Sequence, residues 1–173
     1  MYGGWQYSSF IQTKLLTPLT AGVDTTLSAL LFLLLQLIRH PDVQRRAHME
    51  LDSVIGAPDS PLFRLPAFDD RSSLPYIDAI VKESIRYTPP AAAGVPHAVI
   101  QEDVYRGWAI PKGSIIIPNA WGMLRDPNVY SDPDTFRPER FLWKGTNPPE
   151  PDPGLNGVFG FGKRCVLEWI AST

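Results

Sequence analysis

The stretch Phe159-Gly160-Phe161-Gly162-Lys163-Arg164-Cys165 stands near the end of the chain and contains the only cysteine among its 173 residues. Glycine lets a backbone turn tightly and approach a flat ligand closely, and cations next to a sulfur favour a thiolate over a thiol. The stretch therefore suits a cysteine that ligates iron while its backbone lies against a macrocycle. A glycine-rich surface turn with an incidental cysteine explains the same residues, and the stretch alone leaves both interpretations open.

The composition limits the class of protein. A chain of 173 residues forms one or two domains and is long enough to bury a core. With a net charge of −2 and no cluster of lysine or arginine, we expect no nucleic-acid partner. A single cysteine excludes an intramolecular disulfide framework. Helical patterns fill the first half, and proline, aspartate and tryptophan crowd the second. We therefore predict a mainly α fold with a small β-hairpin or sheet.

Residues 21–40 predict a strong helix, because residues 27–38 are almost wholly apolar. A helix that is apolar on all sides is buried in a core or in a membrane. The run is shorter than the ~18–20 residues that a membrane span needs, which favours a central core helix and leaves a membrane span as the alternative. Residues 1–20 lack the cationic start and cleavage site of a signal peptide, and we interpret them as a separate lead-in.

The start of this helix, Ala21-Gly22-Val23-Asp24-Thr25-Thr26, has two interpretations. An aspartate or threonine before an apolar run is typical of a helix N-cap, and the residues alone favour that structural role. The alternative is functional. In it, Asp24 and Thr25 form an acid–alcohol pair beside a glycine, where a buried helix faces a small bound ligand.

Two further helices are predicted over residues 41–55 and 74–87. The first begins with Pro41 and stops at Gly56. Its expected core face consists of Val43, Ala47, Leu51, Val54 and Ile55. The core stripe expected on the second consists of Ile77, Ile80, Val81 and Ile85. Glu83 and Arg86 lie three residues apart on that second helix, where an ordinary surface ion pair is worth ~0.2–0.5 kcal/mol.

Strand-like and irregular segments follow these helices. Residues 104–110 and 114–118 predict a hairpin, with a type I turn over 111–113 that has proline second and glycine fourth. Residues 119–156 predict a long irregular stretch, and such a stretch in a compact domain is functional or wrongly assigned. Its aromatic residues suggest that it packs onto the rest of the chain: Trp121, Tyr130, Phe136, Phe141 and Trp143.

Four motifs now stand in order along the chain: AGVDTT at 21–26, ESIR at 83–86, FRPERF at 136–141 and FGFGKRC at 159–165. Together with the intervening sequence, notably SLPYIDAIVKESIRYTPP, they resemble the cytochrome P450 haem-thiolate monooxygenases, and the microsomal, fungal-type members most. The resemblance implies that residues 21–173 are a partial cytochrome P450 domain, corresponding to roughly the C-terminal third or more of a full-length member. Residues 1–20 match nothing in it.

The resemblance assigns roles to individual residues. Cys165 would be the axial thiolate ligand of the haem iron, and Arg164 and His97 would hold the haem propionates. Asp24 and Thr25 would lie over the distal face of the haem and steer protons to bound dioxygen. A buried charge network would lock a helix to the irregular stretch behind the haem, and its members would be Glu83, Arg86 and Arg140.

The implied activity is insertion of one oxygen atom of O₂ into a small apolar organic substrate. The family uses an NADPH-dependent reductase and lies on the cytosolic face of the endoplasmic reticulum membrane. The anchor and the lid helices of the family have no counterpart in this sequence, which leaves the localisation of this chain open. Without them, residues 27–38 are expected to form an exposed apolar patch.

The cysteine stretch departs from the family pattern in two places. The family has one residue between the arginine and the cysteine and a glycine two places after the cysteine. Here Arg164 directly precedes Cys165, and Leu167 stands where that glycine is expected. If the register is kept, Val166 occupies the ligand position. The alternative function is therefore a non-catalytic, truncated or mis-spliced remnant of such an enzyme.

Overall fold

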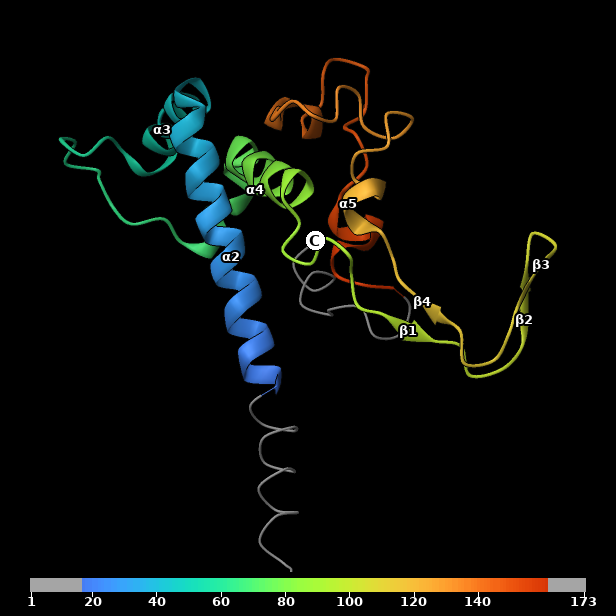
Figure 1. The fold of residues 1–173 in the computed structure, drawn as a ribbon. Helices are drawn as coiled ribbons and strands as arrows, with labels where there is room; N and C mark the ends of the chain where they lie inside the picture. The colour runs from blue at the N-terminus through green and yellow to red at the C-terminus, as the bar shows by residue number, and fades with distance from the viewer. Residues whose placement is uncertain (1–16, 162–173) are drawn as a thin grey trace, which may run out of the picture.

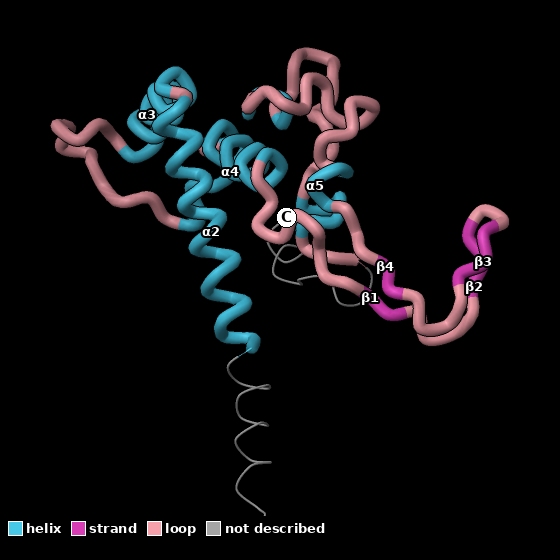
Figure 2. Tube along the Cα trace, viewed as in Figure 1, coloured by secondary structure: helices cyan, strands magenta, loops and turns pink. Residues whose placement is uncertain are grey.

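A computed structural model describes residues 17–161. Three helices pack together, and a thin arm of β-structure extends away from them (Figures 1 and 2). The helices are α2 (Thr17–Arg39), α3 (Pro41–Ile55), α4 (Pro75–Tyr87) and the short α5 (Ala120–Met123). The strands are β1 (His97–Ala98), β2 (Asp103–Tyr105), β3 (Trp108–Ile110) and β4 (Ile115–Ile116). Single turns of tighter or wider helix are η2 (Phe68–Ser73), η3 (Pro138–Phe141) and η4 (Gly154–Val158). The predicted mainly α fold with small antiparallel sheets is confirmed.

Helix α2 already includes Thr17, so Asp24 and Thr25 lie in its interior. An N-cap residue stands before the first helical turn, and the N-cap interpretation of these two residues is therefore wrong. Thr26 donates its hydroxyl hydrogen to the carbonyl oxygen of Gly22 at 2.8 Å. This bond to the preceding turn is one that a threonine makes inside a helix.

The apolar side chains of α2 are largely exposed in the described part of the chain. Leu27, Leu31 and Leu34 keep 52%, 57% and 56% of their surface exposed, because α3 and α4 pack against only one side of the helix, where Leu33 is partly buried. A central core helix is therefore the wrong expectation for these residues, and the expected exposed apolar patch is present. By length and composition alone, the stretch Gly22–Arg39 could cross a membrane.

Helices α3 and α4 form where the sequence predicts them. Each begins with a proline, and α3 is followed by Gly56, whose φ of 83° ends the helix. On α4, however, Val81 is exposed and the buried face includes Glu83 and Arg86. The predicted apolar stripe of α4 was therefore partly wrong, since a charged pair occupies part of the buried side.

Two apolar clusters form the core, and α4 contributes to both. The first cluster joins the three long helices to the irregular stretch and contains Val43, Ala47, Tyr76, Ile80 and Phe136. The second contains Ala79, Leu124, Tyr130 and Phe141. Helix α4 is thus the central element of the described fold.

The carboxylate of Glu50 on α3 caps the N-terminus of α4. It accepts hydrogen bonds from the backbone N–H groups of Tyr76 at 2.8 Å and Ile77 at 2.9 Å. The first N–H groups of a helix have no partner within the helix, and the positive end of the helix dipole favours a negative charge. This cap therefore joins α3 to α4.

Replacement of Glu50 by alanine is expected to lower the free energy of unfolding by about 1–2 kcal/mol, because it removes this cap. Urea unfolding followed by circular dichroism measures the loss. Asp52→Asn is the matched control, since Asp52 is exposed on the same helix and its carboxylate caps nothing. Equal losses for the two variants would show that the cap contributes nothing.

The predicted hairpin is wrong in its pairing. Residues 104–110 are not one strand, because β2 and β3 pair with each other inside this range, with Tyr105 opposite Trp108. The connecting residues Arg106 and Gly107 have φ of 50° and 85°, as in the two-residue turns whose twist matches a hairpin. Strand β4 pairs instead with β1, which places Ile116 opposite His97.

The predicted turn at residues 111–113 exists, but one residue later than expected. The N–H of Ser114 donates to the carbonyl oxygen of Pro111 at 3.1 Å, so Pro111 is first in the turn and Gly113 is third. The φ of Gly113 is 86°, a value that the third position of a type I turn does not have. The type I assignment is therefore wrong.

The irregular stretch at residues 119–156 contains α5, η3 and the start of η4. Tyr130, Phe136 and Phe141 are buried, as expected for a stretch that packs onto the rest of the chain. Trp121 and Trp143 are 49% and 71% exposed, and the expectation fails for them.

Candidate functional site

The ion pair on α4 lies in the protein interior. Arg86 donates from Nε to Oε2 of Glu83 at 2.7 Å and from Nη2 to Oε1 at 2.9 Å. Both side chains are completely buried, so the interpretation as an ordinary surface ion pair is wrong. Two opposite charges removed from water together stabilise a fold only when their hydrogen-bonding groups are satisfied.

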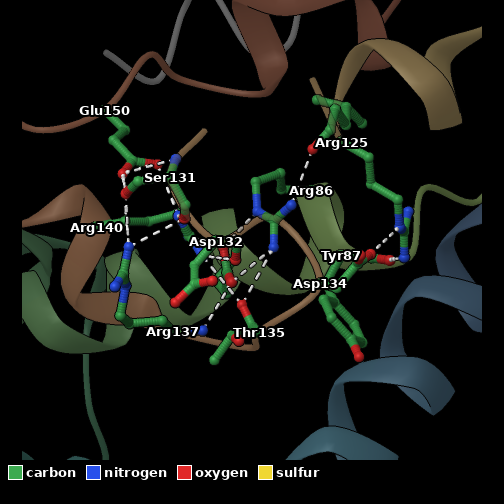
Figure 3. Close-up of polar contacts among 12 residues, drawn as sticks. Arg86, Tyr87, Arg125, Ser131, Asp132, Asp134, Thr135, Arg137, Arg140 and Glu150 are labelled. Atoms are coloured by element: carbon green, nitrogen blue, oxygen red, sulfur yellow. Dashed lines mark hydrogen bonds and ion pairs between the residues drawn. The ribbon is translucent and has the colours of Figure 1, made fainter. Parts of the chain in front are cut away.

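Arg140 joins this pair from η3. Its Nε lies 3.0 Å from Oε2 of Glu83, and its Nη1 lies 2.8 Å from Oε2 of Glu150 (Figure 3). The backbone N–H of Arg137 also donates to Oε1 of Glu83 at 2.7 Å. The structure therefore brings together Glu83, Arg86 and Arg140, and it adds Glu150 as a fourth charged member.

Both guanidinium groups also bind backbone carbonyl oxygens of the irregular stretch (Figure 3). Arg86 donates from Nη1 to Leu124 at 2.9 Å and from Nη2 to Thr135 at 3.5 Å. Arg140 donates to the carbonyl oxygens of Ser131 at 2.6 Å, Asp132 at 3.1 Å and Thr135 at 3.0 Å. A guanidinium offers five N–H donors in a fixed plane, so these two side chains bind several turns of irregular backbone at once.

Glu150 supplies the second negative charge. Its carboxylate accepts hydrogen bonds from the side chain and the backbone N–H of Ser131, and its own N–H donates to the carbonyl oxygen of Arg140 at 2.8 Å. Burial alone would raise the pKa of Glu150, but hydrogen bonds from Ser131 and Arg140 outweigh it and hold the pKa below its usual value. The carboxylates of Glu83 and Glu150 thus face the guanidinium groups of Arg86 and Arg140, and the guanidinium of Arg137 lies 3.8 Å from Glu150.

Lys82 on α4 makes a separate contact with the chain that leads to the cysteine stretch. Its Nζ lies 2.8 Å from Oδ2 of Asp78 and 3.3 Å from Oδ2 of Asp152. Burial alone would lower the pKa of Lys82, but the hydrogen bond to Asp78 and the charges of both carboxylates outweigh it, so the pKa is raised. Asp152 also accepts a hydrogen bond from the N–H of Gly154 at 2.8 Å.

The residues expected to surround a haem lie on separate segments. Asp24 and Thr25 are exposed on the first described turns of α2, and His97 is exposed on β1. Figure 1 shows the first described turns of α2 and strand β1 on separate segments that both extend from the packed helices. Cys165 and Arg164 lie outside the described residues. Within residues 17–161, no group of His, Cys, Asp and Glu could hold a metal ion.

Two glycines in and beside the described part of the cysteine stretch have the backbone freedom that a close approach to a flat ligand needs. Gly157 and Gly160 have φ of 100° and 91°, which glycine adopts without strain. A Cβ atom on Gly157 would lie only 2.4 Å from the ring of Phe161, so a side chain has no room there. With a thiolate, an imidazole and a guanidinium available from Cys165, His97 and Arg164, the donor set also suits an iron macrocycle with carboxylate arms.

Sequence reasoning missed Glu150 and the contact of Lys82 with Asp152. Lys82 follows Asp78 by four residues on one helix, a spacing that predicts an ion pair. The sequence therefore indicated the pair of Lys82 with Asp78 but not the contact of Lys82 with Asp152. Glu150 stands between prolines in NPPEPDP, where neither helical nor strand periodicity marks it. A long-range contact of this kind leaves no local pattern.

Two comparisons with known proteins bear on this arrangement. The family model described as "Cytochrome P450" matches residues 9–167. That range includes the network, the cysteine stretch and residues 9–20 of the segment interpreted as a lead-in.

The relatives are fungal. The chain is 44% identical over 153 residues to the cytochrome P450 monooxygenase claR of Ampulloclitocybe clavipes, covering 88% of this chain and 27% of that protein. It is 45% identical over 149 residues to cytochrome P450 monooxygenase 105 of Postia placenta, covering 86% and 27%. It is 44% identical over 143 residues to the O-methylsterigmatocystin oxidoreductase of Aspergillus flavus, covering 83% and 26%. The chain thus spans about a quarter of the length of the curated relatives it matches.

Proposed function

Because the chain belongs to the cytochrome P450 family, we propose that it forms the haem-binding part of a monooxygenase. Such an enzyme inserts one oxygen atom of O₂ into an organic substrate, which we propose to be small and apolar. The observation that carries the proposal is the family match over residues 9–167, which includes the cysteine stretch. The buried contacts of Glu83, Arg86 and Arg140 support it, since these are the three residues of the charge network that the family resemblance implies.

Three residues would hold the haem in this proposal. Cys165 would bind the iron through its sulfur, and Arg164 and His97 would donate charge-assisted hydrogen bonds to the two carboxylate arms. A thiolate-ligated haem, when bound, supplies the oxygen activation that no amino-acid side chain provides. The exposed imidazole of His97 on β1 and the backbone of Gly157 and Gly160 are compatible with such a ligand.

The other residues of the site would transfer protons to a bound ligand or stabilise the surrounding fold. Asp24 and Thr25 follow each other on α2, where a carboxylate and a hydroxyl can pass a proton to a ligand facing the helix. Gly22, one turn before Thr26, has open space around it, and a Cβ there would touch nothing within 4 Å. We assign the Glu83–Arg86–Arg140 network a structural role, because its members are buried and paired with one another.

The wider setting is proposed from the family. Residues 21–173 would be part of a cytochrome P450 domain, an NADPH-dependent reductase would supply the electrons, and the cytosolic face of the endoplasmic reticulum membrane would be the location. The exposed apolar side chains of α2 are compatible with a membrane setting.

One observation favours a second candidate, a non-catalytic protein of the same family. Arg164 and Cys165 are adjacent, and Leu167 follows two places after the cysteine. One missing residue in a tight loop moves a backbone position by up to about 3.5 Å, and a metal–sulfur bond tolerates little such movement.

Reconstitution of the chain with haem tests the proposal. After reduction and addition of carbon monoxide, the chain is expected to show the strongly red-shifted Soret band of a thiolate ligand, and Cys165→Ser is expected to abolish it. The double variant Cys165→Ser/Val166→Cys moves the sulfur one place along the chain and serves as the matched control. A band from that variant alone would support the non-catalytic protein, and no band from any form would contradict the haem-binding proposal.

A further inference from the structure

We propose that Lys82 and Asp152 form a clamp that positions the stretch leading to Cys165. The proposal rests on the function proposed above, because it deepens the account of the same haem-binding loop. Both are positioning residues, since they act through the backbone that follows Asp152.

The ion pair joins two segments far apart in the sequence. Lys82 stands on α4, one residue before Glu83 of the buried network, and its Nζ lies 3.3 Å from Oδ2 of Asp152. The two side chains are 23% and 17% exposed. Asp78, one turn earlier on α4, holds the same ammonium at 2.8 Å and fixes its position. Water therefore partly screens the ion pair of Lys82 and Asp152, and Asp78 holds the ammonium group in position for it.

Asp152 acts on the backbone as well as on Lys82. While Oδ2 faces the ammonium, Oδ1 accepts the N–H of Gly154 at 2.8 Å. Pro153 between them is completely buried, and its carbonyl oxygen accepts the N–H of Val158 at 3.4 Å. One carboxylate thus links α4 to the first residue of η4, and η4 leads directly into the glycine-rich stretch.

The clamp and the buried network hold neighbouring points of one segment. Arg140 binds Glu150, and Lys82 binds Asp152 two residues later. Beyond this point, Val158 packs against the second core cluster, and Gly160 donates to the carbonyl oxygen of Gly157 at 3.2 Å. Without the clamp, η4 would keep its packing against α4 and α5, but Asp152 would lose its ion pair to α4.

Hydrogen exchange of the haem-free chain tests the clamp directly. Lys82→Met keeps the aliphatic stem but removes the charge. Asp152→Asn keeps an oxygen for the N–H of Gly154 but also removes the charge. Each variant is expected to speed amide exchange in residues 154–160 about two- to fivefold, the range of a partly exposed ion pair. The double variant is expected to exchange no faster than the single ones, because both remove one interaction.

The pair of Arg64 and Asp70 provides a matched control. Asp70 pairs with Arg64 at 2.6 Å and accepts the N–H of Ala67 at 2.7 Å, so it combines an ion pair with a backbone cap as Asp152 does. Arg64→Met and Asp70→Asn are expected to leave exchange in residues 154–160 unchanged. Unchanged exchange in the Lys82 and Asp152 variants, or strictly additive effects, would overturn the clamp.

The rate of haem loss separates this proposal from the function on which it rests. If the loop binds haem, the same two variants are expected to speed haem loss by a similar factor, whereas the control variants do not. Faster exchange in a chain that takes up no haem would support the clamp and contradict the proposed function. Haem uptake with unchanged exchange would support the function and contradict the clamp.

Discussion

Replacement of Glu83 by glutamine is expected to lower the free energy of unfolding by about 3–5 kcal/mol, the usual effect of breaking one partner of a buried ion pair. Glutamine has nearly the shape of glutamate, so no cavity contributes to this loss. The buried guanidinium of Arg86 would lose its carboxylate partner, and that of Arg140 would keep Glu150. A domain is stable by only about 5–15 kcal/mol, so this single change removes a large part of the total.

Urea unfolding, followed by circular dichroism, measures the effect of Glu83→Gln. Asp70→Asn is the control, because it removes the same charge from a pair whose arginine side chain is 48% exposed, and such pairs contribute about 0–1 kcal/mol. Arg86→Met is expected to resemble Glu83→Gln, since it leaves a carboxylate buried with one cation fewer. A loss below about 1 kcal/mol for Glu83→Gln would show that the buried network stabilises the fold no more than an exposed ion pair does.

The second large effect is expected on solubility. The chain should sediment in buffer and stay dispersed with detergent, because Leu27, Leu31 and Leu34 are about half exposed along one face of α2. Apolar surface in water is unfavourable by roughly 25 cal/mol per Å², and large contiguous patches drive association. Replacement of these three leucines by glutamine is expected to keep the chain in solution without detergent.

Leu33 provides the control for this prediction, because it lies on the same helix but packs against the first core cluster. Leu33→Gln is expected to destabilise the fold and to leave the sedimentation unchanged or worse. Analytical ultracentrifugation with and without detergent measures the fraction of the chain that sediments in associated form, and circular dichroism reports the helix content. Continued sedimentation of a folded triple variant would mean that another surface causes the association.

Helices were predictable from the sequence where single residues mark their ends. Helices α3 and α4 each begin with a proline, and the stop of α3 needs only a glycine in the left-handed region. The β-hairpin was missed because its turn lies inside an apparently continuous strand. Gly107 was the available signal, but Arg106 at φ 50° is not a residue that usually occupies such a turn.

The candidate site was predictable to the extent that motifs mark it. Glu83 and Arg86 belong to the ESIR motif and Arg140 belongs to the FRPERF motif, and the structure places the three side chains in contact. The burial of Glu83 was not evident from the spacing, because opposite charges three positions apart on a helix also form surface pairs. Glu150 and Asp152 act through contacts with residues far away in the sequence, which leave no local pattern. The exposed apolar face of α2, by contrast, agrees with the expectation from the sequence.

The contacts of Arg86 and Arg140 with carbonyl oxygens have a consequence for sequence variation. A carbonyl oxygen is present whichever side chain its residue bears, so the contacts at Thr135 place no demand on its side chain. A saturation mutagenesis library is therefore expected to accept many residues at Thr135 and almost none at Arg86. The shape of the most irregular part of the chain is therefore encoded in a few charged positions and in the buried aromatic residues Tyr130, Phe136 and Phe141.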